Sequence, residues 1–219
     1  MTKTVLSILM FFMLIQSAKP QNQAEALALV DALKEKMMEV VRYEANVTIQ
    51  VDVDFINIKE RQARVTFQQP DQFDLKTTGF TLLPRKGAEM EYLQLLYGNH
   101  TALYEKEDTV GGHETSVVKI IPMTDETDII LAQIWIQKDN PRLLKMNTFT
   151  KSNGSFTMRF FYADHPFDMP DKIEITFDIK SFMLPASLSG DLKALEKKIT
   201  EEKTQGKVIL TYSDYRVNE

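Results

Sequence analysis

The clearest pattern in the sequence is a strict alternation of apolar and polar residues between positions 46 and 55. Apolar residues occupy every second position there, at Val47, Ile49, Val51, Val53 and Phe55. Successive side chains of a β-strand point to opposite faces of the sheet. The pattern therefore predicts one long strand with an apolar face and a solvated face.

Similar runs recur along the chain and predict about ten further strand segments. They lie at Ala63–Phe67, Phe73–Leu75, Tyr92–Tyr97, Ala102–Lys106, Ser116–Ile121, Ala132–Ile136, Leu144–Thr150, Phe156–Phe160, Ile173–Ile179 and Val208–Tyr212. Gly111-Gly112 and Asn153-Gly154 fall between neighbouring runs, where such pairs are typical of hairpin turns. Short connections of this kind favour antiparallel pairing.

Two segments show the spacing of amphipathic helices instead. From Ala24 to Tyr43, apolar residues recur every three or four positions, and the stripe Leu188, Leu192, Leu195 and Ile199 predicts a second helix over Leu188–Lys203. Large twisted sheets tend to curl. The pattern as a whole predicts an α+β fold, in which a strongly curved antiparallel sheet of about ten or eleven strands is partly covered by helices.

The first 21 residues follow a different pattern, that of an export signal. Lys3 precedes an apolar run from Val5 to Ile15, and small residues follow at Ser17 and Ala18. A membrane-spanning helix needs about 20 apolar residues, so this run is too short for one. We expect residues 1–21 to be a signal peptide cleaved near Ala18, and residues 22–219 to be one soluble domain in the periplasm.

Composition narrows the class of partner. The chain has a net charge of −5, and loss of Lys3 and Lys19 with the signal would make it −7. Nucleic-acid binding needs a basic surface, so we expect no nucleic-acid partner. The sequence contains no cysteine, which excludes disulfides and acylation of a cysteine at the cleavage site.

Catalytic and metal-binding signals are weak. The three histidines, His100, His113 and His165, lie on separate predicted turns, and no nucleophile, phosphate-loop or zinc-binding motif occurs. Asp52 and Asp54 share one strand face and would suit a divalent ion, but a solvated strand face explains them better. We therefore expect no enzyme activity, no cofactor and no metal, although an envelope hydrolase assembled by the fold stays open.

The segment Arg64–Lys76 resembles the LolA-type lipoprotein carriers, members of the LolA/LolB-like half-barrel superfamily. Members have an opening helix, a long strand and a strand ending in Arg-Pro-x-x-Phe, which corresponds here to Gln69-Pro70-Asp71-Gln72-Phe73. Gly98 and Tyr104 match a further glycine and tyrosine of the family, and Ile134–Tyr162 resembles its second half. This sequence departs from the family motif at Gln69, because the family has an arginine there that holds the lid against the barrel.

The resemblance implies an incomplete β-barrel whose helices form a lid over a hydrophobic cavity for acyl chains. Under it, the inward-pointing strand residues become the cavity lining: Val47, Ile49, Val51, Val53, Val65, Phe67, Phe73, Leu75, Ile134, Ile136, Phe156, Met158, Phe160 and Phe177. Gln69, Leu33 and Met37 become the lid contacts. We expect a glutamate at Met158 or Val65 to abolish lipid binding.

The resemblance also implies a function. We expect a monomeric periplasmic carrier that binds an acylated lipoprotein or a related lipid, with transient protein partners at the inner and outer membranes. Two non-catalytic alternatives stay open. One is a lipid-sensing regulatory module of the same fold, and the other is an envelope β-domain that binds no ligand.

Overall fold

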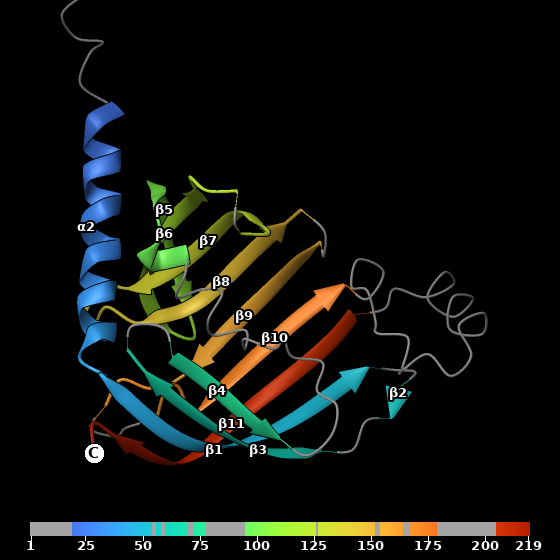
Figure 1. Cartoon of the computed structure of the whole chain (residues 1–219). Coiled ribbons are helices and arrows are strands. Elements are labelled where there is room, and N and C mark those ends of the chain that lie inside the picture. The colour runs from blue at the N-terminus through green and yellow to red at the C-terminus, as the bar shows by residue number, and fades with distance from the viewer. Residues whose placement is uncertain are drawn as a thin grey trace, which may run out of the picture.

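The computed structural model is built around one open antiparallel sheet and a long helix (Figure 1). It describes residues 19–53, 56–57, 60–69, 72–77, 95–125, 127–151, 154–163, 167–178 and 205–219. Residues 1–18 of the expected signal segment, the helix expected at 188–203, Phe55 and residues 92–94 lie outside these ranges. Residues 19–21 of the expected signal segment form the start of the helix. Val53 belongs to a described strand, but its side chain is not described.

The described part of the chain begins with the helix, and the strands follow it. The elements are α2 (Lys19–Met38), β1 (Arg42–Val53), β2 (Ile56–Asn57), β3 (Arg61–Gln68), β4 (Gln72–Thr77), β5 (His100–Val110), β6 (His113–Pro122), β7 (Ile129–Gln137), β8 (Leu143–Thr150), β9 (Ser155–Phe161), β10 (Lys172–Asp178) and β11 (Gln205–Val217).

The sheet order is β4-β3-β1-β11-β10-β9-β8-β7-β6-β5, and the short β2 pairs with β1 beside this path. Most neighbours are consecutive in the chain, as the short predicted turns require. Gly111 and Gly112 have positive φ angles of 61° and 87° at the turn between β5 and β6. The path does not close, so the sheet is an incomplete barrel, which confirms the predicted fold class.

One face of the sheet carries the core. Apolar residues of neighbouring strands stand opposite each other, as in the row Ile134, Met146, Met158, Ile175 and Val208. All five are buried. The alternation read from the sequence therefore assigned Ile134, Met158 and Ile175 to the correct face.

α2 packs on this core through a narrow stripe of apolar side chains. Ala26, Val30 and Leu33, at three- and four-residue spacing, are at most 1% exposed and join the same apolar cluster as the strand residues. The helix contacts β5, and Figure 1 shows it upright beside that end of the sheet.

The predicted helix was displaced along the chain, because α2 runs from Lys19 to Met38 rather than from Ala24 to Tyr43. Arg42 and Tyr43 already pair with Gln68 and Phe67 of β3. The short connection is fixed by Asn218, whose side-chain amide accepts from the Val41 N–H at 2.8 Å and donates to the Glu39 carbonyl at 2.8 Å. These long-range bonds replace the next helical turn and have no signature in the local sequence.

The predicted strand at Tyr92–Tyr97 was also wrong in its described part. Leu95–Tyr97 forms a helical turn. Leu95 and Leu96 are both buried, at 5% and 1% exposure. Two consecutive buried side chains do not suit a strand with one wet face, and the missing alternation was the available signal.

Candidate functional site

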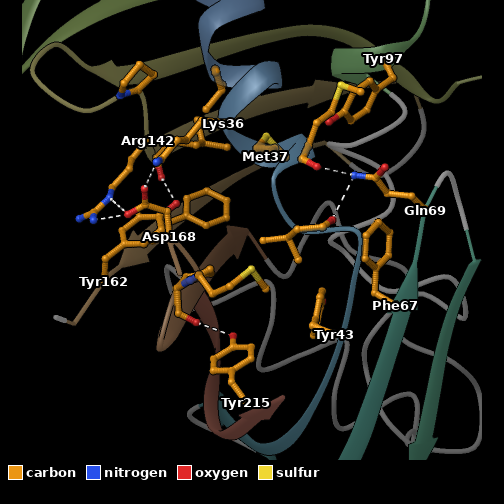
Figure 2. Close-up of a pocket in the computed structure, with 18 of the residues that line it drawn as sticks. Lys36, Met37, Tyr43, Phe67, Gln69, Tyr97, Arg142, Tyr162, Asp168 and Tyr215 are labelled. Carbon is orange, nitrogen blue, oxygen red and sulfur yellow. Dashed lines mark hydrogen bonds and ion pairs between the residues drawn. The ribbon is translucent and has the colours of Figure 1, made fainter. Parts of the chain in front are cut away.

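A cavity of about 310 Å³ opens where the C-terminal end of α2 meets the sheet (Figure 2). Small-molecule sites typically enclose about 300–1,000 Å³ and are lined mainly by apolar and aromatic side chains. This cavity is lined by Leu33, Lys36, Met37, Met38, Val40, Tyr43, Phe67, Gln69, Phe73, Tyr97, Pro141, Arg142, Leu143, Phe160, Tyr162, Asp168, Met169, Pro170 and Tyr215.

The predicted site residues fall into two groups. Phe67, Phe73 and Phe160 line the cavity. The three predicted lid-contact residues, Gln69, Leu33 and Met37, line it as well. The other described strand residues of that prediction pack in the core and are not among the cavity-lining residues. These are Val47, Ile49, Val51, Val65, Leu75, Ile134, Ile136, Phe156, Met158 and Phe177.

This division changes the expected effect of two substitutions. Met158 is fully buried, and Val65 is 1% exposed. A glutamate at either position would lie inside packed core rather than against a ligand. The sequence correctly placed both side chains on the inner face, but alternation cannot separate a core position from a cavity position on one face.

Sequence reasoning missed the charged residues of the cavity. Lys36 lies in the last turn of α2, Arg142 just before β8, and Asp168 in the loop before β10. Lys36 Nζ lies 2.9 Å from one oxygen of Asp168. The Arg142 Nε donates to the other oxygen at 2.6 Å, and its Nη2 also contacts that oxygen. These residues are far apart in the chain, so only the folded structure brings them together.

Asp168 is a shared acceptor for two cations. Burial of the carboxyl group opposes its ionisation, but the hydrogen bonds from Lys36 and Arg142 outweigh this effect and hold the Asp168 pKa below its usual value. The hydrogen bond to Asp168, aided by one to Glu39, raises the pKa of Lys36. Both groups are therefore charged at neutral pH, and the contact ties α2 to the loop before β10.

The interaction of Asp168 with Lys36 and Arg142 should weaken in acid. A carboxyl group with a depressed folded-state pKa contributes stability above its unfolded pKa of about 3.9, and that stability disappears as the pH falls through the folded value. We expect Asp168→Asn to lower stability at neutral pH by about 1–3 kcal/mol and to reduce the further loss below about pH 4. Urea unfolding of both proteins across pH measures this. An unchanged acid dependence would exclude a stabilising role for the tie.

Gln69 holds the end of α2 from the other side of the cavity. Its Nε2 donates to the carbonyl oxygens of Met38 and Val40, both at 3.1 Å, and its backbone N–H donates to the Val41 carbonyl at 2.9 Å. The last carbonyl groups of a helix have no partner within the helix. The Gln69 amide thus supplies a partner for the last carbonyl group of α2, at Met38, and also binds the Val40 carbonyl in the connection that follows; Figure 2 shows both bonds.

Loss of this amide should loosen the helix end. Each neutral hydrogen bond contributes about 0.5–1.5 kcal/mol, so we expect Gln69→Ala to lower stability by about 1–3 kcal/mol. Amide hydrogen exchange at the C-terminal turn of α2 should accelerate. Gln68→Ala is the matched control, since Gln68 is exposed on the opposite face. Gln69→Arg should keep slow exchange, because its guanidinium also donates to carbonyl groups, and exchange as fast as in Gln69→Ala would contradict this.

Tyrosine side chains border the cavity. Tyr162 is partly buried, its hydroxyl group donates to the Leu143 carbonyl at 3.1 Å, and the Arg142 guanidinium lies 5.1 Å from its ring centroid. Burial raises the pKa of Tyr162, so its hydroxyl group is protonated at neutral pH. Tyr215 donates to the Pro170 carbonyl at 2.8 Å. These rings thus offer apolar faces while their hydroxyl groups are occupied.

Metal clusters and membrane-spanning helices are both absent from the described part of the chain. Within the described ranges, no three histidine, aspartate or glutamate side chains gather where they could hold a metal ion. Asp52 is exposed, and Asp54 lies outside these ranges. No described helix is long and apolar enough to cross a bilayer.

Neither a protein-family model nor a curated protein sequence matches this chain. Several solved structures do match it. A domain assigned to outer membrane lipoprotein sorting, from Vibrio parahaemolyticus, aligns with TM-score 0.60 and 11% identity over 90% of this chain and 94% of its own.

Two further structures agree. A DUF1329 family protein from Desulfovibrio piger has TM-score 0.58 and 8% identity, covering 90% of this chain and 93% of its own. A LolA superfamily protein from Nitrosomonas europaea has TM-score 0.56 and 10% identity, covering 89% and 94%. Together with the open sheet and its helix, these alignments confirm the resemblance at the level of the fold: the chain has the fold of LolA-superfamily and lipoprotein-sorting domains.

Proposed function

We propose that this protein is a periplasmic carrier that binds the acyl chains of lipoproteins, or of a related amphiphile, and passes them toward the outer membrane. The observation that carries the proposal is the cavity beside α2, where aromatic rings and methionines from the helix, the sheet and the loop before β10 converge. The assignment of a protein with this fold to outer membrane lipoprotein sorting supports it.

The physical need for such a carrier follows from the acyl chain. Each buried CH₂ group is worth about 0.8 kcal/mol, so a chain of ordinary length cannot cross an aqueous space unaided. A carrier must cover the chain and still release it. Met37, Met38 and Met169 suit this requirement, because a flexible thioether side chain adapts to ligands of different shape.

In this proposal, the end of α2 is the part of the cavity wall that moves. Its two ties, Gln69 on one side and Asp168 on the other, are polar contacts at partly exposed positions. Each of these contacts contributes only about 1–3 kcal/mol, an amount that the burial of an acyl chain can offset. In the proposed mechanism, the helix end lifts from the sheet as a ligand enters and returns over the occupied cavity.

The remaining parts of the proposal come from the sequence. The signal at residues 1–21 would export the chain, and no cysteine is present for acylation, so the mature protein would move freely between membranes. Its membrane partners would be transient, and it would act as a monomer without cofactor, nucleic acid or enzymatic step. Under this proposal the core residues of the predicted lining would contact the ligand only if the sheet opens further, and Val53 stays a predicted lining residue.

The experiment that tests the proposal is release of an acylated lipoprotein from inner-membrane vesicles. We expect purified mature protein to move the lipoprotein into the soluble fraction as a stoichiometric complex. A lipoprotein that lacks its acylated cysteine serves as the control, because it needs no carrier.

The alternatives predict different outcomes. A lipid-sensing module would bind acyl chains without releasing the lipoprotein from vesicles. A β-domain without a ligand would do neither. Either result would contradict the carrier proposal.

A further inference from the structure

We infer that the cavity takes an amphiphile with an anionic head group, a carboxylate or a phosphate, held at the rim by the Lys36 ammonium and the Arg142 guanidinium. The inference rests on the proposed function and narrows the ligand class. It excludes neutral and cationic head groups as the preferred ligands of this site.

The charge balance of the cavity supports the inference. The whole chain is acidic, with net charge −5. The charged residues that line the cavity are nevertheless two cations, Lys36 and Arg142, and one anion, Asp168. Glu39 also contacts Lys36, but its side chain is 64% exposed and it is not among the lining residues. Within the described lining, an incoming anion therefore meets a net positive charge in an acidic protein.

The hydrogen-bonding capacity of the three groups points the same way. Both Asp168 oxygens already accept from a cation. A lysine ammonium has three donors and a guanidinium has five. The contacts given above use the Lys36 ammonium twice, toward Asp168 and Glu39, and use Nε and Nη2 of Arg142. The remaining N–H groups of Lys36 and Arg142 can only donate hydrogen bonds, so they need an acceptor. An anionic oxygen supplies one.

The position of the charges suits an amphiphile. The side chains of Lys36 and Arg142 are 30% and 26% exposed, so an oxygen from solvent can reach them. Met37, Phe160 and Met169 line the same cavity and offer apolar contacts to a chain attached to that head group. Figure 2 shows the three charged groups together on one side of the cavity, with Gln69 and Tyr97 on the other. One ligand can thus reach both kinds of surface.

Two substitutions separate a head-group site from a purely structural tie. Lys36→Gln removes a cation and keeps a good helix former. Asp168→Asn removes the anion that competes for both cations. If the cluster only ties α2 to the sheet, both changes break the same contact and alter the binding of every ligand in the same direction. If it binds an anion, the two changes act in opposite directions on anionic ligands alone.

The test is calorimetric titration with hexadecanoate, hexadecyl phosphate and hexadecanol, below the concentrations at which they aggregate and at a pH where the acids are ionised. The three probes share one chain and differ only in the head group. We expect at least one anionic probe to bind about tenfold more tightly than the alcohol, the ratio that one charge-assisted hydrogen bond supports. Lys36→Gln should abolish this preference, and Asp168→Asn should increase it.

The outcomes distinguish this inference from the proposed function. A preference for the carboxylate identifies fatty acids as the source of the anion, and a preference for the phosphate identifies phospholipid-like ligands. Equal binding of all three probes would overturn the anionic head group and leave the acyl-chain carrier intact. No binding of any probe, by protein shown to be folded by circular dichroism, would overturn both.

Discussion

Met158→Glu is expected to unfold the protein, not to yield a folded protein that fails to bind lipid. Met158 is fully buried on β9 and stands between Met146 of β8 and Ile175 of β10, which are also buried. An unpaired carboxylate in such a place is among the few changes that cost about 4–5 kcal/mol or more. Whole domains are stable by about 5–15 kcal/mol, so this single charge removes a large part of the total.

Urea unfolding followed by circular dichroism measures the effect. Met158→Leu is the apolar control and should cost less than about 1.5 kcal/mol, since the two side chains have similar volume. Ser155→Glu, at an exposed position of the same strand, controls for the added charge. A Met158→Glu protein with near-normal stability would mean that the inner face holds a ligand space at this point in place of packed core.

Phe67→Glu is expected to abolish acyl-chain binding while the protein stays folded. Phe67 lies on the cavity wall, is only partly buried, and its ring centroid is 5.5 Å from that of Tyr43. In the empty protein a carboxylate there can reach water. A bound acyl chain would exclude that water, and an unpaired carboxylate against an apolar ligand is strongly unfavourable. We expect a loss of affinity of about a hundredfold or more.

Hexadecanol is the suitable probe for this variant, because a neutral ligand separates loss of the apolar wall from repulsion between charges. Gln68→Glu provides the matched control. Gln68 is the next residue of β3, is exposed on the opposite face and stands across from Arg42 of β1. It should bind as the unmodified protein does. Unchanged binding by Phe67→Glu would place the ligand elsewhere.

The sheet was predictable from the sequence because its signal is local. Alternation with period two assigned Ile49, Met158 and Ile175 to the inner face without knowledge of their partners, and a Gly-Gly and an Asn-Gly pair marked turns. The order of β1 beside β11 was not predictable, since the two strands lie at opposite ends of the chain and pair only in the fold.

The apolar part of the cavity was only partly predictable. Its aromatic residues Phe67, Phe73 and Phe160 follow the same alternation as core residues, so the sequence gives no means to separate the two groups. Gln69 was identified through the family motif, and its hydrogen bonds show what the residue at that motif position does at the end of α2.

The charged part was not predictable at all. Lys36, Arg142 and Asp168 come from a helix, a hairpin and a loop, and each resembles an ordinary surface residue in its local sequence. Their proximity is a property of the tertiary structure alone.

The central claim is that the cavity beside α2 holds an acyl chain, and native mass spectrometry of protein purified from the periplasm tests it most directly. We expect a species heavier than the polypeptide by the mass of an acyl-bearing molecule, and we expect Phe67→Glu to lose it. A bare polypeptide mass from the unmodified protein, under conditions that preserve a known lipid carrier's complex, would contradict the claim.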